Sequence, residues 1–274
     1  MKKFFWGVMG LVGLMGLVGC DKIEESEYTV YDGAVVNWTP SATSITAVQR
    51  VYVEKFTGPR CSNCPNADVT LGTIHNDNVV MVSINHPTGQ GIPYPNQPDL
   101  RTDGGNAWDA WFGINAIPAA YINRDRGTQY QGDMGNIVSA INNAMATEPT
   151  VALEAEASLQ SGKVQIIVDL QFVKEYSAPV TLTVAIVEDS LRYKQLLPDG
   201  TYDENYVHNH MLRKVITGFW GRDVEATGAE GEHLTGTLSF TPADDINLAN
   251  SHIVAFISDK GSRKVLNCVS CKIN

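Results

Sequence analysis

Two cysteines separated by two residues, Cys61 and Cys64, have the residue type and spacing of a thiol pair that can exchange electrons. They follow residues 48–56, a hydrophobic run with the composition of a buried strand, and precede a pattern typical of a helix. At a helix start, free N–H groups and the helix dipole favour a thiolate on Cys61, and the guanidinium of Arg60 adds to this effect. Cys64 could then attack a mixed disulfide on Cys61 and release the partner. The same motif also occurs in zinc sites and inert disulfides.

The first 19 residues have the features of an export signal. Lys2 and Lys3 precede residues 4–18, an uncharged stretch too short to cross a bilayer comfortably as a helix. Small residues before Cys20 look like a lipobox, which would make Cys20 the acylated first residue of the mature protein, with palmitate as a typical acyl group. A signal cleaved elsewhere and an uncleaved anchor are the alternatives. We expect a protein that is attached to a membrane of the cell envelope through lipid on Cys20.

Composition and charge limit the partners and the organisation of the chain. The 274 residues carry a net charge of −10, and without residues 1–19, which hold two lysines and no acids, 18 basic and 30 acidic side chains leave −12. Nucleic acid is therefore not an expected partner. About 250 mature residues can bury a sizeable core, most naturally as two domains. We predict an acidic tether and linker at residues 20–47, a first domain at 48–147 and a second at 148–274.

The first predicted domain has the pattern of an α/β unit. After the helix that follows Cys64, residues 79–84 form an apolar run typical of a buried parallel strand. Residues 86–106 are rich in Pro, Gly, Asn and Asp, which is typical of an irregular surface excursion. A later apolar strand opens with Pro118, and residues 137–145 repeat apolar side chains at helical spacing.

This order of elements resembles that of a thioredoxin-like domain, and residues 112–118, Phe-Gly-Ile-Asn-Ala-Ile-Pro, are similar to the segment that leads to its cis-proline. The resemblance implies that the bond between Ile117 and Pro118 is cis and that its loop lies against the two cysteines. It also implies that the backbone of Ile117 is free to pair with an extended substrate. An ordinary trans proline at a strand edge is the alternative.

Two departures from thioredoxins bear on the activity. Lys55, with Glu54 beside it, stands where thioredoxins carry a buried acid, and a charged ammonium there favours the Cys61 thiolate but cannot accept its proton. Ser62 and Asn63 replace the Gly-Pro of thioredoxin, so its redox potential cannot be transferred to this chain. Reductase, oxidase and isomerase all remain open.

Three segments, residues 54–58, 63–67 and 209–213, look like the twenty-eight-kilodalton outer-membrane lipoprotein family of Bacteroidota. The resemblance covers nearly the whole mature chain and implies a thioredoxin-like domain followed by an immunoglobulin-like domain. It also implies an outer-membrane location, on the periplasmic or the surface face. The acidic residues 21–27, directly after Cys20, resemble export tags that favour the cell surface, with a charged linker as the alternative.

The second predicted domain reads as an all-β sandwich. Residues 163–173 and 180–186 alternate apolar and other side chains, which predicts half-buried strands. Further candidate strands lie at residues 151–159, 234–240, 252–258 and 264–273. Six or seven short strands in about 125 residues fit an immunoglobulin-like sandwich, a fold that more often presents surfaces than performs chemistry.

Residues 191–223 form a long polar and aromatic connection between these strands. His208 and His210 would face the same side of an extended segment, but no third metal ligand is evident nearby, so we favour a hydrogen-bonded structural pair over a metal site. The aromatic side chains of this connection are expected to pack against the first domain, with part of a binding surface as the alternative.

A second Cys-x-x-Cys, Cys268 and Cys271, lies near the end of the sequence. Residues three apart on a regular strand point to opposite faces, so a disulfide between them requires a turn or bulge. An exported structural disulfide is the first expectation. Unpaired thiols, a second redox pair feeding the first, and a zinc site made from both pairs are the alternatives.

Two functions from different classes follow. The first is thiol–disulfide exchange on exported proteins, with Cys61 as attacking thiolate, Cys64 as resolving thiol, Pro118 in the substrate loop and Arg60 as electrostatic helper. Its partners would be protein thiols or disulfides, and no cofactor is expected because no nucleotide-binding motif or serine elbow occurs. The second is a non-enzymatic binding lipoprotein of the envelope in which Cys61 and Cys64 form a permanent disulfide.

Overall fold

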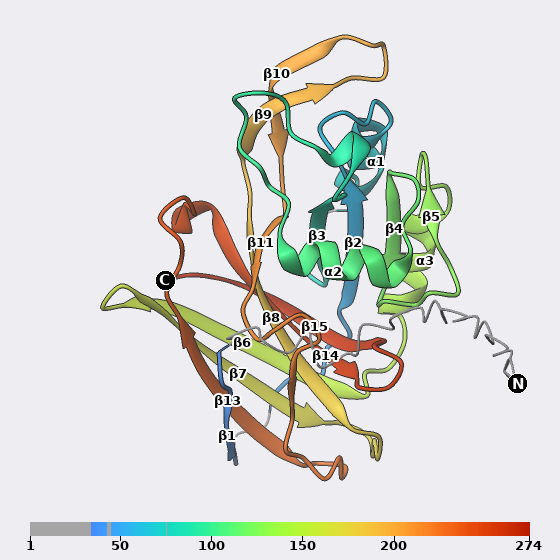
Figure 1. Cartoon of the computed structure of the whole chain (residues 1–274). Helices are drawn as coiled ribbons and strands as arrows, with labels where there is room; N and C mark the ends of the chain where they lie inside the picture. Colours follow the sequence, from blue (N-terminus) through green and yellow to red (C-terminus); the bar gives the residue numbers. More distant parts are fainter. Residues whose placement is uncertain (1–33, 43–44, 75) are drawn as a thin grey trace, which may run out of the picture. The chain divides into compact units, whose positions relative to one another are not determined.

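The computed structural model describes residues 34–42, 45–74 and 76–274 (Figure 1). The predicted signal, residues 1–19, and the predicted lipidation site, Cys20, lie outside the described residues. The described part is rich in β-structure arranged in several sheets. Its three α-helices have nine or ten residues each, and none is long and apolar enough to cross a membrane.

The first half of the described chain is built around β2 (Val51–Thr57), every residue of which is buried. Parallel to it runs β3 (Val79–Asn85), with Val51 opposite Val79, and α1 (Cys64–Gly72) connects the two strands. On the other side of β2, β4 (Ala119–Ile122) pairs antiparallel. The remaining elements of this half are β5 (Tyr130–Gln131), the 3-10 turn η2 (Gly89–Gly91), α2 (Asp103–Phe112) and α3 (Ile137–Met145).

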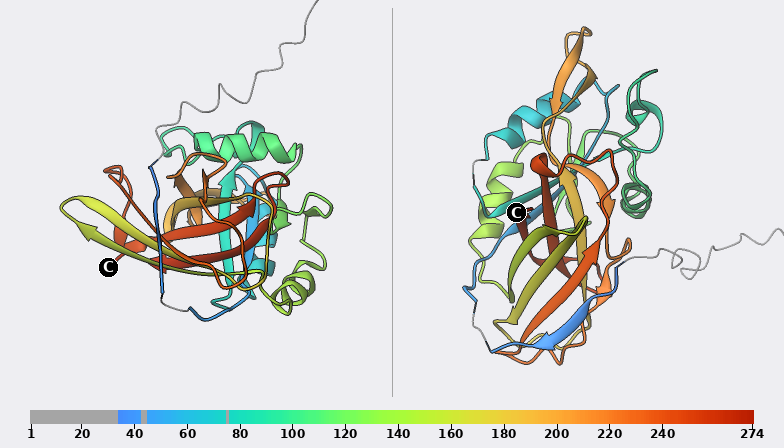
Figure 2. Two further views of the ribbon diagram at one scale, coloured as in Figure 1. Left: turned by 90° about the horizontal axis from the view of Figure 1, so that it is seen from below. Right: turned by 90° about the vertical axis from the view of Figure 1, so that its left-hand side faces the viewer.

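Helices cover both faces of these strands (Figure 2). On one face, α1 and α3 pack on β2, with Leu71 and Ile141 against Val51 and Val53. On the other face, Trp108 of α2 joins the aromatic core around β2 and β3. Because residues of a strand alternate between faces, this double coverage explains why every residue of β2 is buried.

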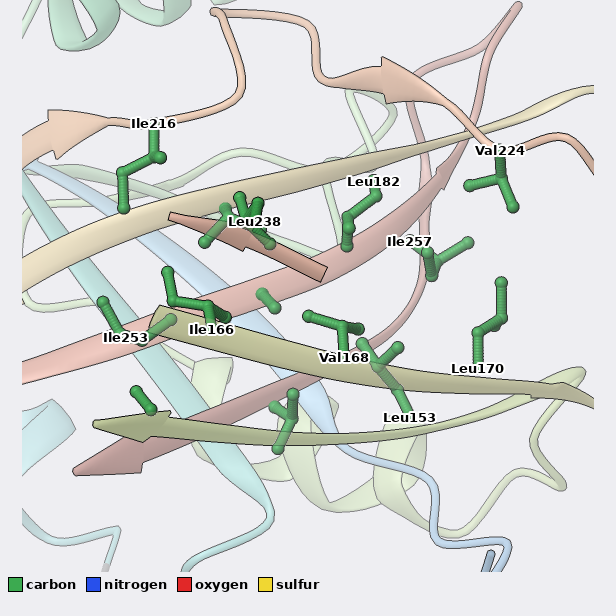
Figure 3. Packing of buried hydrophobic residues seen from close by; sticks show 14 of the residues in the cluster. Leu153, Ile166, Val168, Leu170, Leu182, Ile216, Val224, Leu238, Ile253 and Ile257 are labelled. Atoms are coloured by element: carbon green, nitrogen blue, oxygen red, sulfur yellow. The ribbon is translucent and has the colours of Figure 1, made fainter. Parts of the chain in front are cut away.

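The second half forms two packed layers of strands with an apolar core between them. One layer has the order β1-β13-β7-β6, and the other contains β8, β14 and β15. Side chains such as Leu153, Ile166 and Leu238 meet Ile253 and Ile257 between the layers (Figure 3). The strands are β1 (Asn37–Pro40), β6 (Val151–Gln160), β7 (Lys163–Phe172), β8 (Val180–Glu188), β12 (Arg222–Asp223), β13 (His233–Phe240), β14 (Ser251–Asp259) and β15 (Val265–Lys272), with a 3-10 turn η3 (Leu248–Asn250).

The strand β1 lies within the segment that the sequence predicted as tether and linker. It pairs antiparallel with β13, with Trp38 opposite Gly236. A Cβ atom on Gly236 would lie 2.8 Å from the indole ring of Trp38, so the glycine is what allows this ring to lie flat on the strand. The chain therefore contributes a strand to the second half before it enters the first.

One sheet passes through both predicted domains, in the order β15-β14-β8-β11-β3-β2-β4-β5. The connecting strand, β11 (Met211–Val215), pairs antiparallel with β8 and meets β3 in parallel at Met211 and Ser83. This contact covers the edge of β3, which would otherwise present unpaired backbone groups. The predicted boundary at residue 148 thus divides the sequence but not the sheet.

The segment between β8 and β11 is not an irregular connection throughout. It contains β9 (Leu191–Leu196) and β10 (Tyr202–His208), which pair antiparallel as a separate two-stranded sheet. We call this unit the β9–β10 hairpin. Figure 1 shows it in orange beside α1.

Candidate functional site

Cys61 and Cys64 form a disulfide, with their Cα atoms 5.4 Å apart. The sequence placed Cys61 at the start of a helix, but α1 begins at Cys64, so Cys61 lies in the turn that precedes it. Backbone bonds shape this turn: Cys61 N–H donates to Gly58 O (3.1 Å) and Cys64 N–H donates to Cys61 O (3.3 Å). The disulfide closes this turn at the end of β2.

The peptide bond between Ile117 and Pro118 is cis, as the sequence predicted. The pairing of β2 with β4 sets Phe56 opposite Ala119, which places Pro118 beside the end of β2 from which the cysteine turn departs. Pro118 is buried and Ile117 is half-buried. The two expected parts of the site therefore meet at the same end of β2.

Both cysteines are almost fully covered, each with 1% of its surface exposed. The β9–β10 hairpin contacts the cysteine turn directly. The Gln195 side-chain amide donates to Cys61 O (2.9 Å) and Gly58 O (3.3 Å), and Leu196 N–H donates to Pro59 O (2.8 Å). A structural unit from the second half of the chain thus packs directly on the backbone of the cysteine turn.

Arg60 anchors a second cover, the excursion of residues 86–102 between β3 and α2. Its guanidinium donates to Ile92 O and Pro93 O, both at 2.9 Å, and lies 4.4 Å from the centre of the Tyr94 ring. Tyr94 in turn meets the hairpin residue Tyr202, with ring centres 5.8 Å apart. Arg60 therefore links the cysteine turn to the excursion, and its role as an electrostatic helper stays a prediction.

A partly buried ion pair lies behind the cysteine turn. Lys55, with 8% of its surface exposed, pairs through Nζ with Asp68 of α1. Oδ2 of Asp68 also accepts a hydrogen bond from the Tyr206 hydroxyl of the hairpin (2.9 Å). Burial and the charge of Asp68 raise the pKa of Tyr206. Lys55 and Asp68 line a cavity of about 240 Å³ between α1 and β10.

Lys55 was predicted from the sequence, Tyr206 was predicted only as one of the aromatic residues that pack against the first domain, and Asp68 was not predicted. A signal for Asp68 was available, because it stands four residues after Cys64 and so lies on the same face of α1. Tyr206 and Gln195 could not be found in this way. Their role depends on the folding of a hairpin more than 100 residues away in the sequence back onto the cysteine turn.

His208 and His210 do not form the expected hydrogen-bonded pair. The ring of His208 lies 5.1 Å from that of Tyr206, and burial lowers the pKa of His208 to about 4. Nδ1 of His210 instead lies 3.1 Å from Oδ1 of Asp189, whose other oxygen lies 3.4 Å from His252 Nε2. A positive φ of 58° at His210 breaks the alternation on which the expectation rested. Within the described ranges, no cluster of three or more metal-ligating side chains occurs.

The expected disulfide between Cys268 and Cys271 is wrong, because both cysteines are free. They lie on β15 opposite Phe256 and Ile253 of β14, without the turn that such a bond requires. Cys268 faces the core around β2, whereas Cys271 packs on the other side of the sheet, against the core between the two layers. Burial raises the pKa of both thiols, that of Cys271 to about 11. A second redox pair would need the same closure of the two sulfurs.

The fold and the site define a β-rich protein of several sheets with a covered Cys-x-x-Cys disulfide. The chain belongs to the family described as outer membrane protein Omp28, whose sequence profile matches residues 105–274. This confirms the predicted family and the outer-membrane location. The match includes Pro118 but begins after Cys61 and Cys64, so the disulfide lies outside the matched region.

Solved structures extend the comparison to the fold. HBP35 of Porphyromonas gingivalis is similar with a TM-score of 0.61 and 16% identity, over 84% of this chain and 77% of its own. A domain of the outer membrane lipoprotein Omp28 from Porphyromonas gingivalis has a TM-score of 0.33 and 21% identity, over 46% of this chain and 89% of its own. No curated protein matches the chain.

Proposed function

We propose that this chain is a lipid-anchored outer membrane protein whose first half is thioredoxin-like and exchanges thiols and disulfides with exported proteins. The observation that carries the proposal is the position of the Cys61–Cys64 disulfide and the cis Ile117–Pro118 bond at the same end of β2. The parallel β2–α1–β3 unit, the antiparallel β4 and the helices on both faces support the fold assignment. The lipobox-like sequence before Cys20 and the outer-membrane family support the anchor.

The exchange transfers two electrons in two steps. A substrate thiolate attacks Sγ of Cys61, the bond between Cys61 and Cys64 breaks, and Cys64 leaves with the electron pair as a thiolate. A second thiolate of the same substrate then attacks the substrate sulfur in the mixed disulfide, and Cys61 leaves as a thiolate. The substrate dithiol becomes a disulfide as it loses two electrons and two protons, and the protein disulfide becomes a dithiol. The reverse sequence reduces a substrate disulfide.

The surrounding residues can assist both steps. The carbonyl and N–H of Ile117 take part in no backbone hydrogen bond within the part of the chain that the structure describes, so they can pair with an extended substrate. Asp68 lies one helical turn after Cys64 and pairs with Lys55, so an acid stands near the position at which thioredoxins carry theirs.

A second candidate function is envelope binding without chemistry, with Cys61–Cys64 as a permanent structural disulfide. The 1% exposure of each cysteine favours it, because an attacking thiolate must reach a sulfur. The two functions imply the same fold. They differ in whether reduced Cys61 and Cys64 exchange electrons with other proteins.

The test measures the equilibrium potential of the pair against glutathione and the pKa of Cys61 in the reduced protein, with Cys64→Ser as the control that lacks the resolving thiol. The proposal expects a reversible equilibrium in the glutathione range and a pKa of Cys61 below the ordinary cysteine value of about 8.5. A disulfide that glutathione cannot reduce, together with a pKa of Cys61 near about 8.5, would favour the binding function.

A further inference from the structure

The β9–β10 hairpin is an insertion with little packing of its own. It forms a two-stranded sheet that no ladder joins to the nine-stranded sheet. An isolated two-stranded hairpin is marginally stable, so its position depends on contacts with its neighbours. The small apolar cluster at its base comprises Leu100, Leu191 and Met211, with Tyr193 packed against it. Beyond this base, the hairpin contacts the excursion through Tyr202 and Lys194, which meet Tyr94 and Gln97, and it contacts the cysteine turn and α1 through hydrogen bonds.

Those polar contacts are few and identifiable. Gln195, with 2% of its surface exposed, bonds the carbonyl oxygens of Cys61 and Gly58, and Leu196 N–H bonds that of Pro59. From the other strand, Tyr206 bonds Asp68 of α1. Each such bond adds little net stability, so a local opening of the hairpin is far less costly than unfolding of the core.

One residue at each end of the hairpin has a positive φ, a strained backbone conformation that can act as a hinge. Ser190, just before β9, has φ of 61°, and His210, just after β10, has φ of 58°. Left-handed non-glycine residues are strained and cluster at segments that move. Two hydrogen bonds link the ends of the hairpin to each other: Ser190 N–H donates to Asn209 Oδ1 (2.9 Å) and His210 N–H donates to Asp189 Oδ1 (2.6 Å). The hairpin can therefore rotate as a unit while its base stays fixed.

We infer that the β9–β10 hairpin is a lid that occupies the docking site of an extended polypeptide and must open before Cys61 can be attacked. An open lid leaves the carbonyl oxygen of Pro59 without the Leu196 donor, and it removes the Gln195 donor from the carbonyl oxygens of Gly58 and Cys61, which keep their bonds within the turn. A polypeptide in extended conformation offers backbone N–H groups at a suitable spacing to replace Gln195 and Leu196. Binding of a polypeptide beneath the lid rests on the proposed function, whereas opening of the lid does not.

The first experiment follows reduction of the disulfide in the native protein by tris(2-carboxyethyl)phosphine, with alkylation of Cys61 and Cys64 read by mass spectrometry. We expect Tyr206→Phe to accelerate reduction about fivefold and Gln195→Ala about 25-fold, because they remove one bond and two bonds from the lid. Arg192→Ala is the matched control, since this exposed side chain bonds only Asn205 O within the hairpin. The control should reduce at the wild-type rate.

Two results would overturn the lid. One is an equal rate of reduction in wild type, Gln195→Ala and Tyr206→Phe. The other is a rate whose urea dependence equals that of global unfolding, because the sulfurs would then be exposed only when the whole chain unfolds. Neither outcome depends on turnover of a substrate. The hairpin can therefore be a lid even if the proposed exchange does not occur, and the exchange can occur even if the hairpin is not a lid.

The second experiment tests the occupant in the Gln195→Ala protein. A short cysteine peptide and a twin that is N-methylated at the residues flanking its cysteine attack the oxidised protein, and the mixed disulfide is quantified. Docking through backbone N–H groups predicts that the unmethylated peptide reacts about tenfold faster. Equal rates would contradict a polypeptide docking site beneath the lid.

Discussion

The side-chain amide of Gln195 donates a 2.9 Å hydrogen bond to the backbone carbonyl of Cys61, a residue 134 positions earlier in the chain. The amide is buried, so the second half of the sequence completes the surroundings of the disulfide in the first half. Any chemistry at Cys61 is therefore coupled to the position of the β9–β10 hairpin.

The number of free thiols distinguishes one disulfide from two. In a Cys20→Ser protein kept oxidised and unfolded in guanidinium, Ellman's reagent should detect two thiols, those of Cys268 and Cys271. Prior reduction should raise the number to four. Detection of no thiols before reduction would mean that Cys268 and Cys271 are bonded after all.

The stability of the protein should decrease in mild acid because of His208. Burial lowers its pKa from 6.5 to about 4, so the unfolded chain binds a proton in this window while the folded chain does not. Stability is thus fully present above pH 6.5 and falls as the pH drops toward about 4, by at most about 3 kcal/mol. Urea unfolding of wild type and His208→Gln at pH 7 and pH 4.5 measures this difference. A gap between the two proteins that is the same at both pH values would contradict it.

The pair of Lys55 and Asp68 should behave as a partly buried ion pair. Asp68→Asn leaves the ammonium of Lys55 without its counter-charge and should destabilise the protein by about 2 kcal/mol, less than for a fully buried pair because Asp68 is partly solvated. Lys55→Met should cost less, because an apolar side chain of similar length fills the same space. The exposed pair of Lys174 and Glu148 is the control: Lys174→Ala should change the free energy of unfolding by less than about 1 kcal/mol. Equal effects of Asp68→Asn and Lys174→Ala would show that the pair is effectively solvated.

The excursion of residues 86–102 depends on a glycine beside the cysteine turn. A Cβ atom on Gly58 would lie 2.4 Å from the carbonyl oxygen of Gln90, whereas one on Gly72 would meet nothing within 4 Å. Gly58→Ala should therefore destabilise the protein by about 2 kcal/mol, and Gly72→Ala should be neutral or slightly stabilising. Thermal and urea unfolding of both variants measure the difference. A neutral Gly58→Ala would mean that the excursion can move away without loss.

Local patterns predicted the elements that carry their own signal. The apolar run of β3 and the alternation in β7 follow from residues close together in the sequence. The alternation in β8 predicted a half-buried strand, but all nine residues of β8 are buried because apolar cores lie on both of its faces. The cis bond before Pro118, which the resemblance to thioredoxin-like domains implied, is confirmed. The start of α1 was predicted one turn early, because the turn that closes the disulfide precedes the helix.

Features that depend on distant pairing could not be predicted. Polar and aromatic residues of β9 and β10 lack a simple alternation, so they read as a loop, and their pairing with each other became visible only in the structure. The single sheet that joins both halves depends on the meeting of Met211 and Ser83, which no local pattern indicates. Cys268 and Cys271 stay apart because β15 is a regular strand between two cores, a fact that their spacing alone does not reveal.

The most direct test of the central claim is turnover of a protein disulfide by the purified chain, in the presence of a glutathione buffer that keeps Cys61 and Cys64 in exchange. The proposed function predicts catalysis that is abolished by Cys61→Ser, unaffected by Cys271→Ser, and increased by the lid variant Gln195→Ala. Turnover that is absent from wild type and from Gln195→Ala alike would contradict thiol–disulfide exchange and leave Cys61–Cys64 as a structural disulfide.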